Sequence, residues 1–372
     1  MEEIARTLNS FKISGNTNLP TKKTEYNVNN YLKNRKTHFR VLVSQYFYIV
    51  LFKAAITGGL LIIGTSLLIG REITLGQFVA SEVIIILILT SVEKIITYMD
   101  VVYDMLTAVD KISQVTDMPL EKPGGIELSN AQVQKGFTVE IKNLSYKYPE
   151  KHEAALKDIN LSFKCGENVC IVGGNESGKT TLTNTISGIN QDYTGAIVIN
   201  GYSLRDLDLT NLRDKLAKNV SQEDIFEGTI LDNITVGKPM VTTLDAAEAI
   251  KKVGLADKVN MLPGGLNTEV VSGGKGFSSS FINKLIMARL LVKKPRLMIL
   301  NDFFAFFEKE EKEKLIKLVT SEEICTLIAV SNDPLVMAAC DKVVVLDNGS
   351  VKAQGSYAEL LKAGELNHLI KI

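Results

Sequence analysis

Residues 173–180 have the residue types and the spacing of a loop that binds phosphate. They read G-G-N-E-S-G-K-T, which fits the pattern G-x-x-x-x-G-K-T at every fixed position. Glycines let backbone N–H groups turn toward phosphate oxygens, and a following helix adds partial positive charge at its N-terminus. In such a loop Lys179 reaches the outer phosphates and the Thr180 hydroxyl ligates magnesium. We therefore expect a nucleoside triphosphate with Mg²⁺ as the ligand.

A strand and a helix must hold this loop in place. Residues 167–172 (E-N-V-C-I-V) read as a short apolar strand, and residues 181–186 read as the start of a helix. The competing interpretation, a glycine-rich turn with a surface lysine, does not require that context. The residues expected to contact the nucleotide phosphates are Gly173, Gly174, Asn175, Glu176, Ser177, Gly178, Lys179, Thr180 and Thr181.

Length and composition limit the remaining possibilities. A chain of 372 residues favours two domains, and 45% hydrophobic residues with 23% charged residues suit a packed chain. The formal net charge is zero, so we expect no nucleic-acid partner, which would need a basic stripe. None of the four cysteines forms a C-x-x-C pair, and the three histidines are far apart in sequence. Buried, reduced thiols and the absence of a histidine-based metal site are therefore expected.

Two apolar stretches near the N-terminus predict a membrane hairpin. The first covers residues 47–70 and carries only Lys53, and the second covers residues 75–98 and is interrupted by Glu82. A buried helical hairpin in a soluble core is the alternative. Basic residues cluster before the first stretch and place that end in the cytoplasm. We expect a multi-pass protein of the cell (inner) membrane, in contact with lipid, whose phosphate-binding domain lies in the cytoplasm.

From residue 137 onward the chain alternates strands with helices, as an α/β domain does. Further motifs follow in a fixed order: Tyr148 in Y-K-Y-P, Gln222 in V-S-Q-E, and the run G-T-I-L-D-N-I at residues 228–234. In this order the motifs resemble the C-terminal part of an ATP-binding-cassette (ABC) exporter half-transporter. The resemblance implies ATP and Mg²⁺ as ligands, with Tyr148 stacked on adenine and Gln222 at the magnesium–water shell.

The resemblance also implies a domain plan. It predicts an α-helical transmembrane hairpin followed by an α/β P-loop NTPase (ABC cassette) domain with a helical subdomain. The partial transmembrane domain would cover residues 1–118, the linker 119–136 and the cassette 137–372, with the helical subdomain at about 223–295. The family works with paired cassettes, so a second cassette subunit is expected, identical or different. We expect a separate polypeptide to supply the other four membrane helices.

Three motifs depart from the family pattern. Asn301-Asp302 stands where the family has Asp-Glu after the apolar strand, and Asn332 stands where it has the switch histidine. The resemblance implies that Asp302, Gln222 and Asn332 hold the catalytic positions, and that Thr180, Gln222 and Asn301 hold the metal positions. Asn301 brings no negative charge, and Asp302 is one methylene shorter than glutamate. Asp302 as a simple helix cap is the competing interpretation.

The family signature L-S-G-G-Q aligns with F-S-S-S-F at residues 277–281, in a register set by Ala288-Arg289. Both signature glycines are replaced, and Ser278 is the residue that we expect to reach a partner's nucleotide at a helix N-terminus. The four phenylalanines of residues 303–307 fit either an ordinary core or a subunit interface.

Two functions fit these observations. The first is an ATP-binding subunit of an ABC-type exporter that binds Mg-ATP and hydrolyses it slowly or not at all. The alternative is a non-catalytic structural or regulatory membrane protein, or a truncated transporter fragment. Whether the chain is an enzyme stays open at the sequence level, because the Walker B, signature and switch-histidine positions are all altered.

Overall fold

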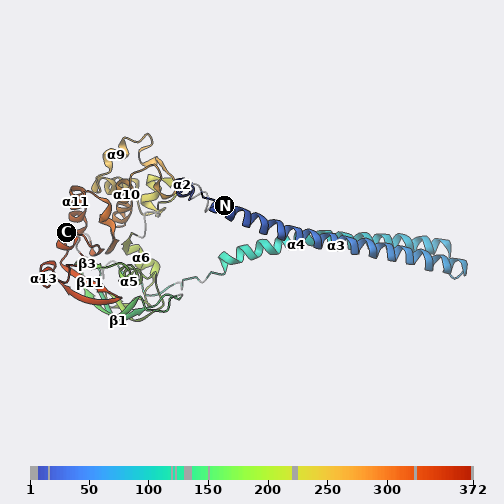
Figure 1. The fold of residues 1–372 in the computed structure, drawn as a ribbon, viewed down its shortest axis with the longest axis horizontal. Coiled ribbons are helices and arrows are strands. Elements are labelled where there is room, and N and C mark those ends of the chain that lie inside the picture. Colours follow the sequence, from blue (N-terminus) through green and yellow to red (C-terminus); the bar gives the residue numbers. More distant parts are fainter. Residues whose placement is uncertain are drawn as a thin grey trace. The chain divides into compact units, whose positions relative to one another are not determined.

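The computed structural model describes residues 7–15, 17–118, 120–121, 124–129, 136–149, 151–219, 225–321 and 325–369. The chain divides into two compact units, residues 1–120 and 121–372, and each is described by itself. Figure 1 shows the helical character of the first unit and the mixed strands and helices of the second.

The first unit is helical. It contains α2 (Leu8–Ile13), α3 (Leu19–Ile69) and α4 (Leu75–Thr116). The turn between the two long helices ends at Thr74, whose side chain forms a capping box with Gln77 at the start of α4. A Cβ at Gly64 would lie 2.3 Å from the Phe78 ring, so a small residue is needed where α3 meets α4. Within the described residues, two helices are long and apolar enough to cross a membrane.

The two apolar stretches carry charges that pair with each other. The Lys53 ammonium on α3 forms an ion pair with the Glu93 carboxylate on α4. Charged groups in such a setting are costly unless they have a partner, so this pair joins the two helices at one level. Glu82, which interrupts the second apolar stretch, is half-buried.

The described residues of the second unit form three sheets. The six-stranded sheet has the order β12-β11-β3-β10-β9-β6, and only β12 runs antiparallel to its neighbour. Its strands are β3 (Asn168–Gly173), β6 (Leu216–Lys218), β9 (Leu297–Asn301), β10 (Thr326–Val330), β11 (Lys342–Asp347) and β12 (Ser350–Gly355). The central strands are continuous apolar runs because helices cover the sheet: every residue of β10 is buried.

The other two sheets are antiparallel. The four-stranded sheet, in the order β2-β1-β4-β5, consists of β1 (Val139–Tyr146), β2 (Leu156–Phe163), β4 (Tyr193–Ile199) and β5 (Tyr202–Ser203). A two-stranded ribbon pairs β7 (Gly228–Thr229) with β8 (Glu269–Val270).

The helices of this unit alternate with its strands along the chain. They are α5 (Lys179–Ile186), α6 (Leu209–Lys215), α7 (Ile230–Thr235), α8 (Thr243–Lys252), α9 (Ala256–Asn260), α10 (Ser279–Val292), α11 (Lys309–Thr320), α12 (Pro334–Ala338) and α13 (Tyr357–Lys362). Short 3₁₀ turns occupy Gly265–Asn267, Ser272–Gly274 and Phe303–Phe306. The predicted boundaries of the linker and of the helical subdomain stay predictions.

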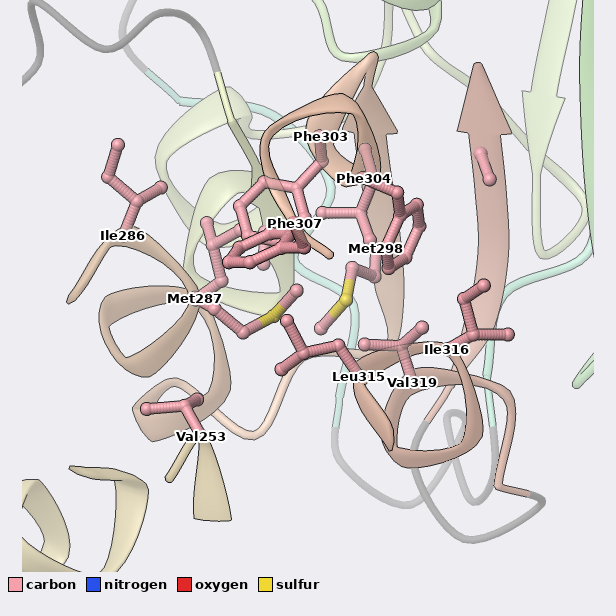
Figure 2. Packing of buried hydrophobic residues seen from close by; sticks show 14 of the residues in the cluster. Val253, Ile286, Met287, Met298, Phe303, Phe304, Phe307, Leu315, Ile316 and Val319 are labelled. Atoms are coloured by element: carbon pink, nitrogen blue, oxygen red, sulfur yellow. The ribbon is translucent and has the colours of Figure 1, made fainter. Parts of the chain in front are cut away.

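A large core joins α10, α11 and one face of the six-stranded sheet. Figure 2 shows the rings of Phe303, Phe304 and Phe307 gathered with Met287 and Met298. All three rings are buried, and their edge-to-face and tilted contacts are typical of packed aromatic side chains. Phe306 alone of the four is largely exposed, at 47%. Three of the phenylalanines therefore belong to the core, and one points away from it.

Candidate nucleotide-binding site

The phosphate-binding loop joins the end of β3 to the start of α5. Gly178 is the N-cap of α5 with φ 97°, a left-handed conformation that favours glycine. A Cβ at Gly178 would lie 2.8 Å from the Ala155 carbonyl oxygen, and one at Gly173 would lie 2.4 Å from the Leu346 carbonyl oxygen. The glycines at the first and sixth positions of the motif are thus required by close packing of backbone on backbone.

Lys179 lies folded over the loop. Its ammonium donates to the carbonyl oxygens of Gly173 at 2.9 Å and Gly174 at 2.6 Å, and to Ser177 Oγ at 3.3 Å. Burial lowers the pKa of Lys179, and the negative charge of Asp302 opposes that shift. The sequence pattern placed Lys179 at the phosphates, and the structure also places it within electrostatic reach of Asp302.

A cavity of about 550 Å³ opens beside this loop. Tyr148 lies on its wall, as do residues 151–155 and residues 176–181 of the motif. The Tyr148 hydroxyl is 3.2 Å from Thr181 Oγ1, and the Tyr146 ring packs edge-on against the Tyr148 ring at 5.0 Å. One cavity therefore combines phosphate-binding backbone with an aromatic side chain, an arrangement that fits a nucleoside triphosphate.

Asn301, at the end of β9, lies beside the first turn of α5. Its Oδ1 accepts a hydrogen bond from Thr183 Oγ1 at 3.2 Å, and the same hydroxyl lies 3.0 Å from the Thr180 carbonyl oxygen. Asn219 holds the backbone of Asn301 through two bonds, at 2.7 and 2.9 Å. A neutral amide oxygen on the α5 side of the loop suits Mg²⁺, which keeps several waters and needs few protein ligands. The oxygen donors of Thr180 and Asn301 are therefore compatible with magnesium, but Asn301 contributes an amide and not a carboxylate.

Asp302 follows in a left-handed conformation, with φ 45° and ψ 24°. Its N–H donates to the Val330 carbonyl oxygen at 2.9 Å, and its side chain makes no capping hydrogen bond to the 3₁₀ turn that follows. Asp302 thus occupies the N-cap position of this turn, as the competing interpretation expected, but its side chain makes no capping hydrogen bond. The carboxylate is exposed, and its charge acts on Lys179.

Asn332 follows β10 and contacts the first residue of the loop. Its side-chain amide bonds to both backbone groups of Gly173, accepting from N–H at 3.1 Å and donating to the carbonyl oxygen at 3.0 Å. Because β10 lies next to β3 in parallel register, the residue after β10 reaches the residue that ends β3. The structure thus brings Asn332, Asn301 and Asp302 to the phosphate loop.

Two candidates stand apart from this group. Ser278 is the N-cap of α10, where its Oγ accepts the Phe281 N–H at 3.2 Å, and it does not line the nucleotide cavity of its own chain. The rings of Phe277 and Phe281 stack at 4.6 Å, with Phe281 buried. Gln222 lies outside the described residues. The binding and catalytic roles of all these residues stay predictions.

Sequence reasoning missed two residues of the site. Asn219 and Thr183 hold Asn301 in place, but neither belongs to a short motif. The only sequence signal for Thr183 was its spacing, one helical turn after Lys179 on the same face of α5.

Comparisons with known proteins agree on one class. The family model for the ABC transporter matches residues 156–305. A Staphylococcus aureus (strain NCTC 8325 / PS 47) protein described as a multidrug export ATP-binding/permease protein is 30% identical over 264 residues, which cover 70% of this chain and 45% of the relative. The alpha-hemolysin translocation ATP-binding protein HlyB of Escherichia coli O157:H7 is 28% identical over 301 residues, which cover 80% and 42%. The chain spans about half the length of these curated relatives.

A solved structure supports the fold independently. A bacterial Atm1-family ABC exporter with ATP bound matches 99% of this chain and 64% of its own, with a TM-score of 0.82 and 20% identity. The fold is therefore a helical N-terminal segment followed by an α/β ABC cassette, as the sequence predicted. The cassette has ABC exporter ATP-binding domains among its homologues.

Proposed function

We propose that this chain is the ATP-binding subunit of an ABC-type membrane exporter that binds Mg-ATP and hydrolyses it slowly. The observation that carries the proposal is the complete phosphate loop, beside which Asn301 places a neutral amide where the family has a carboxylate. Phosphate contacts depend on Lys179, the loop backbone and the N-terminus of α5, and all three are present. Hydrolysis additionally needs a base, a charged metal ligand and a complementary partner surface.

Each of those three requirements is weakened here. Magnesium, when bound, would neutralise charge on the phosphates, with the Thr180 hydroxyl and the Asn301 amide as its nearest protein ligands. Asp302 is the carboxylate available to orient an attacking water, and a side chain shorter by one methylene leaves it about 1.5 Å from the place that glutamate would reach. A misplacement of about 1 Å can cost a hundredfold in rate.

The partner surface is altered as well. In a paired assembly Ser278 and the N-terminus of α10 would face the nucleotide of a second cassette. The stacked Phe277 and Phe281 replace the first and last signature residues there, and Ser279 and Ser280 replace its glycines. We propose a second ABC cassette as partner, with the membrane-helical unit in the lipid bilayer and the cassette in the cytoplasm. Two relatives are described as export and translocation proteins, which favours transport as the process served.

The test is nucleotide binding together with ATPase activity of the purified chain. A fluorescent ATP analogue should bind the wild type, and Lys179→Met should abolish binding. Turnover should lie well below 1 s⁻¹, a rate typical of working enzymes, and the double variant Asn301→Asp/Asp302→Glu should raise it at least tenfold. Absence of binding at millimolar nucleotide would refute the proposal.

The same experiment distinguishes the alternative, non-catalytic function from slow ATP hydrolysis. A non-catalytic regulatory subunit is favoured by the use of Asn332 as a bridge to Gly173, which leaves its amide committed to the backbone. In that case the double variant would bind ATP but would stay inactive, because the signature and Asn332 would still block hydrolysis.

A further inference from the structure

Part of the wall of the nucleotide cavity is formed by the turn that follows Tyr148. The Lys151 N–H closes this turn by donating to the Tyr148 carbonyl oxygen at 3.1 Å. Three consecutive residues of the turn line the cavity, namely Lys151, His152 and Glu153, and all three are exposed. Their side chains are therefore accessible to a molecule that is bound in the cavity.

The path of the chain places this turn between the two ends of a bound nucleotide. Tyr148, which we expect to stack on adenine, precedes His152 by four residues. Three residues after His152, the chain lies against the phosphate loop, because a Cβ at Gly178 would be 2.8 Å from the Ala155 carbonyl oxygen. A nucleotide whose base stacks on Tyr148 and whose outer phosphates reach Lys179 presents its ribose and α-phosphate to this turn.

The fixed charges on the cavity wall cancel, so the charge of His152 determines the sign of the wall. Two lysines and two glutamates line the cavity beside it: Lys151, Lys179, Glu153 and Glu176. Asp302 is outside this lining, although its charge acts on Lys179. Within the described part of the chain, the His152 imidazole has no hydrogen-bond or ion-pair partner. Histidine changes its charge between about pH 5 and 8, so the wall becomes positive as the pH falls through this range.

We propose that the protonated imidazole of His152 binds the α-phosphate of the nucleotide, so that affinity for the nucleotide increases as the pH falls. This inference rests on the nucleotide site proposed above and adds a pH-dependent contact to it. An imidazolium N–H that donates to a phosphate oxygen forms a charge-assisted hydrogen bond. Lys179 acts on the outer phosphates, whereas the α-phosphate is common to ATP and ADP. Both nucleotides therefore gain affinity from His152.

Binding of ADP to the full chain at about pH 6 and about pH 8 tests this contact without hydrolysis. His152→Gln keeps a side chain that can donate a hydrogen bond but removes the charge. We expect the wild type to bind ADP about threefold more tightly than His152→Gln at the lower pH, the effect of one solvent-exposed ion pair. At the higher pH the two proteins should bind equally. Protonation of ADP itself is common to both proteins and cancels in the ratio of affinities.

Two further variants and a shorter nucleotide complete the comparison. His152→Lys is positively charged at both pH values, so it should bind ADP about threefold more tightly than the wild type at about pH 8. His368→Gln removes an exposed imidazole that does not line the cavity and should bind as the wild type does at both pH values. AMP, which keeps only the α-phosphate, should show the same ratio of affinities between wild type and His152→Gln as ADP does.

Equal affinity of wild type and His152→Gln for ADP at about pH 6 would overturn this contact and leave the nucleotide site standing. A ratio that ADP shows and AMP does not would also overturn it, because the charge would then act on the outer phosphate. Failure of the wild type and of every variant to bind ADP at millimolar concentration would refute the nucleotide site itself, and with it the role of His152.

Discussion

Asn332 and Gly173 are joined by two hydrogen bonds through a single side-chain amide, at 3.1 and 3.0 Å. A primary amide presents its donor and acceptor side by side, as a β-strand residue presents its own N–H and C=O, whereas the two nitrogens of an imidazole point away from each other. Asparagine can therefore extend the sheet-like pairing of β10 and β3 by one residue, and histidine cannot. This pairing anchors the first residue of the phosphate loop.

Removal of this side chain should loosen the loop. We expect Asn332→Ala to weaken ATP binding about tenfold, since two hydrogen bonds of about 0.5–1.5 kcal/mol each are lost. Titration with a fluorescent ATP analogue measures the change. Asn260→Ala, at an exposed end of α9, is the control and should bind as the wild type does. An unchanged affinity in Asn332→Ala would show that the loop keeps its conformation without the amide.

Two glycines of the loop should respond differently to alanine. Gly178 has φ 97° and a Cβ there would meet the Ala155 carbonyl oxygen at 2.8 Å, whereas a Cβ at Gly174 would meet no atom within 4 Å. Gly178→Ala should therefore lower the free energy of unfolding by about 1–3 kcal/mol. Gly174→Ala should change it by less than about 1 kcal/mol. Thermal unfolding without nucleotide distinguishes the two, and equal melting temperatures would contradict the packing argument.

Local patterns predicted the loop, because its residue types are contiguous. The predicted strand 167–172 and helix from 181 correspond to β3 and α5, within one or two residues. The contact of Asn332 with Gly173 joins residues 159 positions apart and depends on the pairing of β10 with β3. No short motif encodes that pairing. Likewise the sequence at residues 303–307 could not show which phenylalanines are buried. Phe306 has the same residue type as its neighbours and differs from them only in the exposure of its side chain.

An ion pair between a buried lysine and a partly exposed glutamate joins α10 to α11 and should be sensitive to removal of one partner. The Lys284 ammonium, on a residue only 6% exposed, donates to Glu311 Oε1 at 2.7 Å, and Ser280 Oγ donates to the other carboxylate oxygen at 3.1 Å. The bond from Lys284 lowers the pKa of Glu311. Glu311→Ala leaves the lysine charge buried and should lower the unfolding free energy by about 3 kcal/mol.

The double variant Lys284→Met/Glu311→Leu is the matched comparison for this pair. It removes both charges and keeps the volume, so we expect it to recover most of the lost stability. Chemical denaturation of the single and double variants gives the two values. A double variant as unstable as Glu311→Ala would mean that packing, and not the unpaired charge, determines the loss.

Lys218, the last residue of β6, should make stability depend on pH. Its ammonium donates to Asn184 Oδ1 and, at 3.3 Å, to Ser187 Oγ, and burial lowers its pKa from 10.5 to about 7. Above pH 7 the unfolded chain binds this proton and the folded chain does not. By linkage, this residue therefore makes the free energy of unfolding rise between pH 7 and 10.5. Below pH 7 the folded protein bears the full cost of burying the charged ammonium.

Lys218→Met removes the titrating group and keeps an unbranched side chain. We expect it to unfold at a higher Tm than the wild type at pH 6, with a gain of roughly 2 kcal/mol. The gain should shrink as the pH rises toward 9, because the neutral amine then keeps its two hydrogen bonds without the cost of a buried charge. Lys251→Met, at an exposed position on α8, should show no such pH dependence. A Tm difference between Lys218→Met and wild type that stays constant from pH 6 to pH 9 would mean that Lys218 keeps its charge throughout, and that water reaches its ammonium in the folded protein.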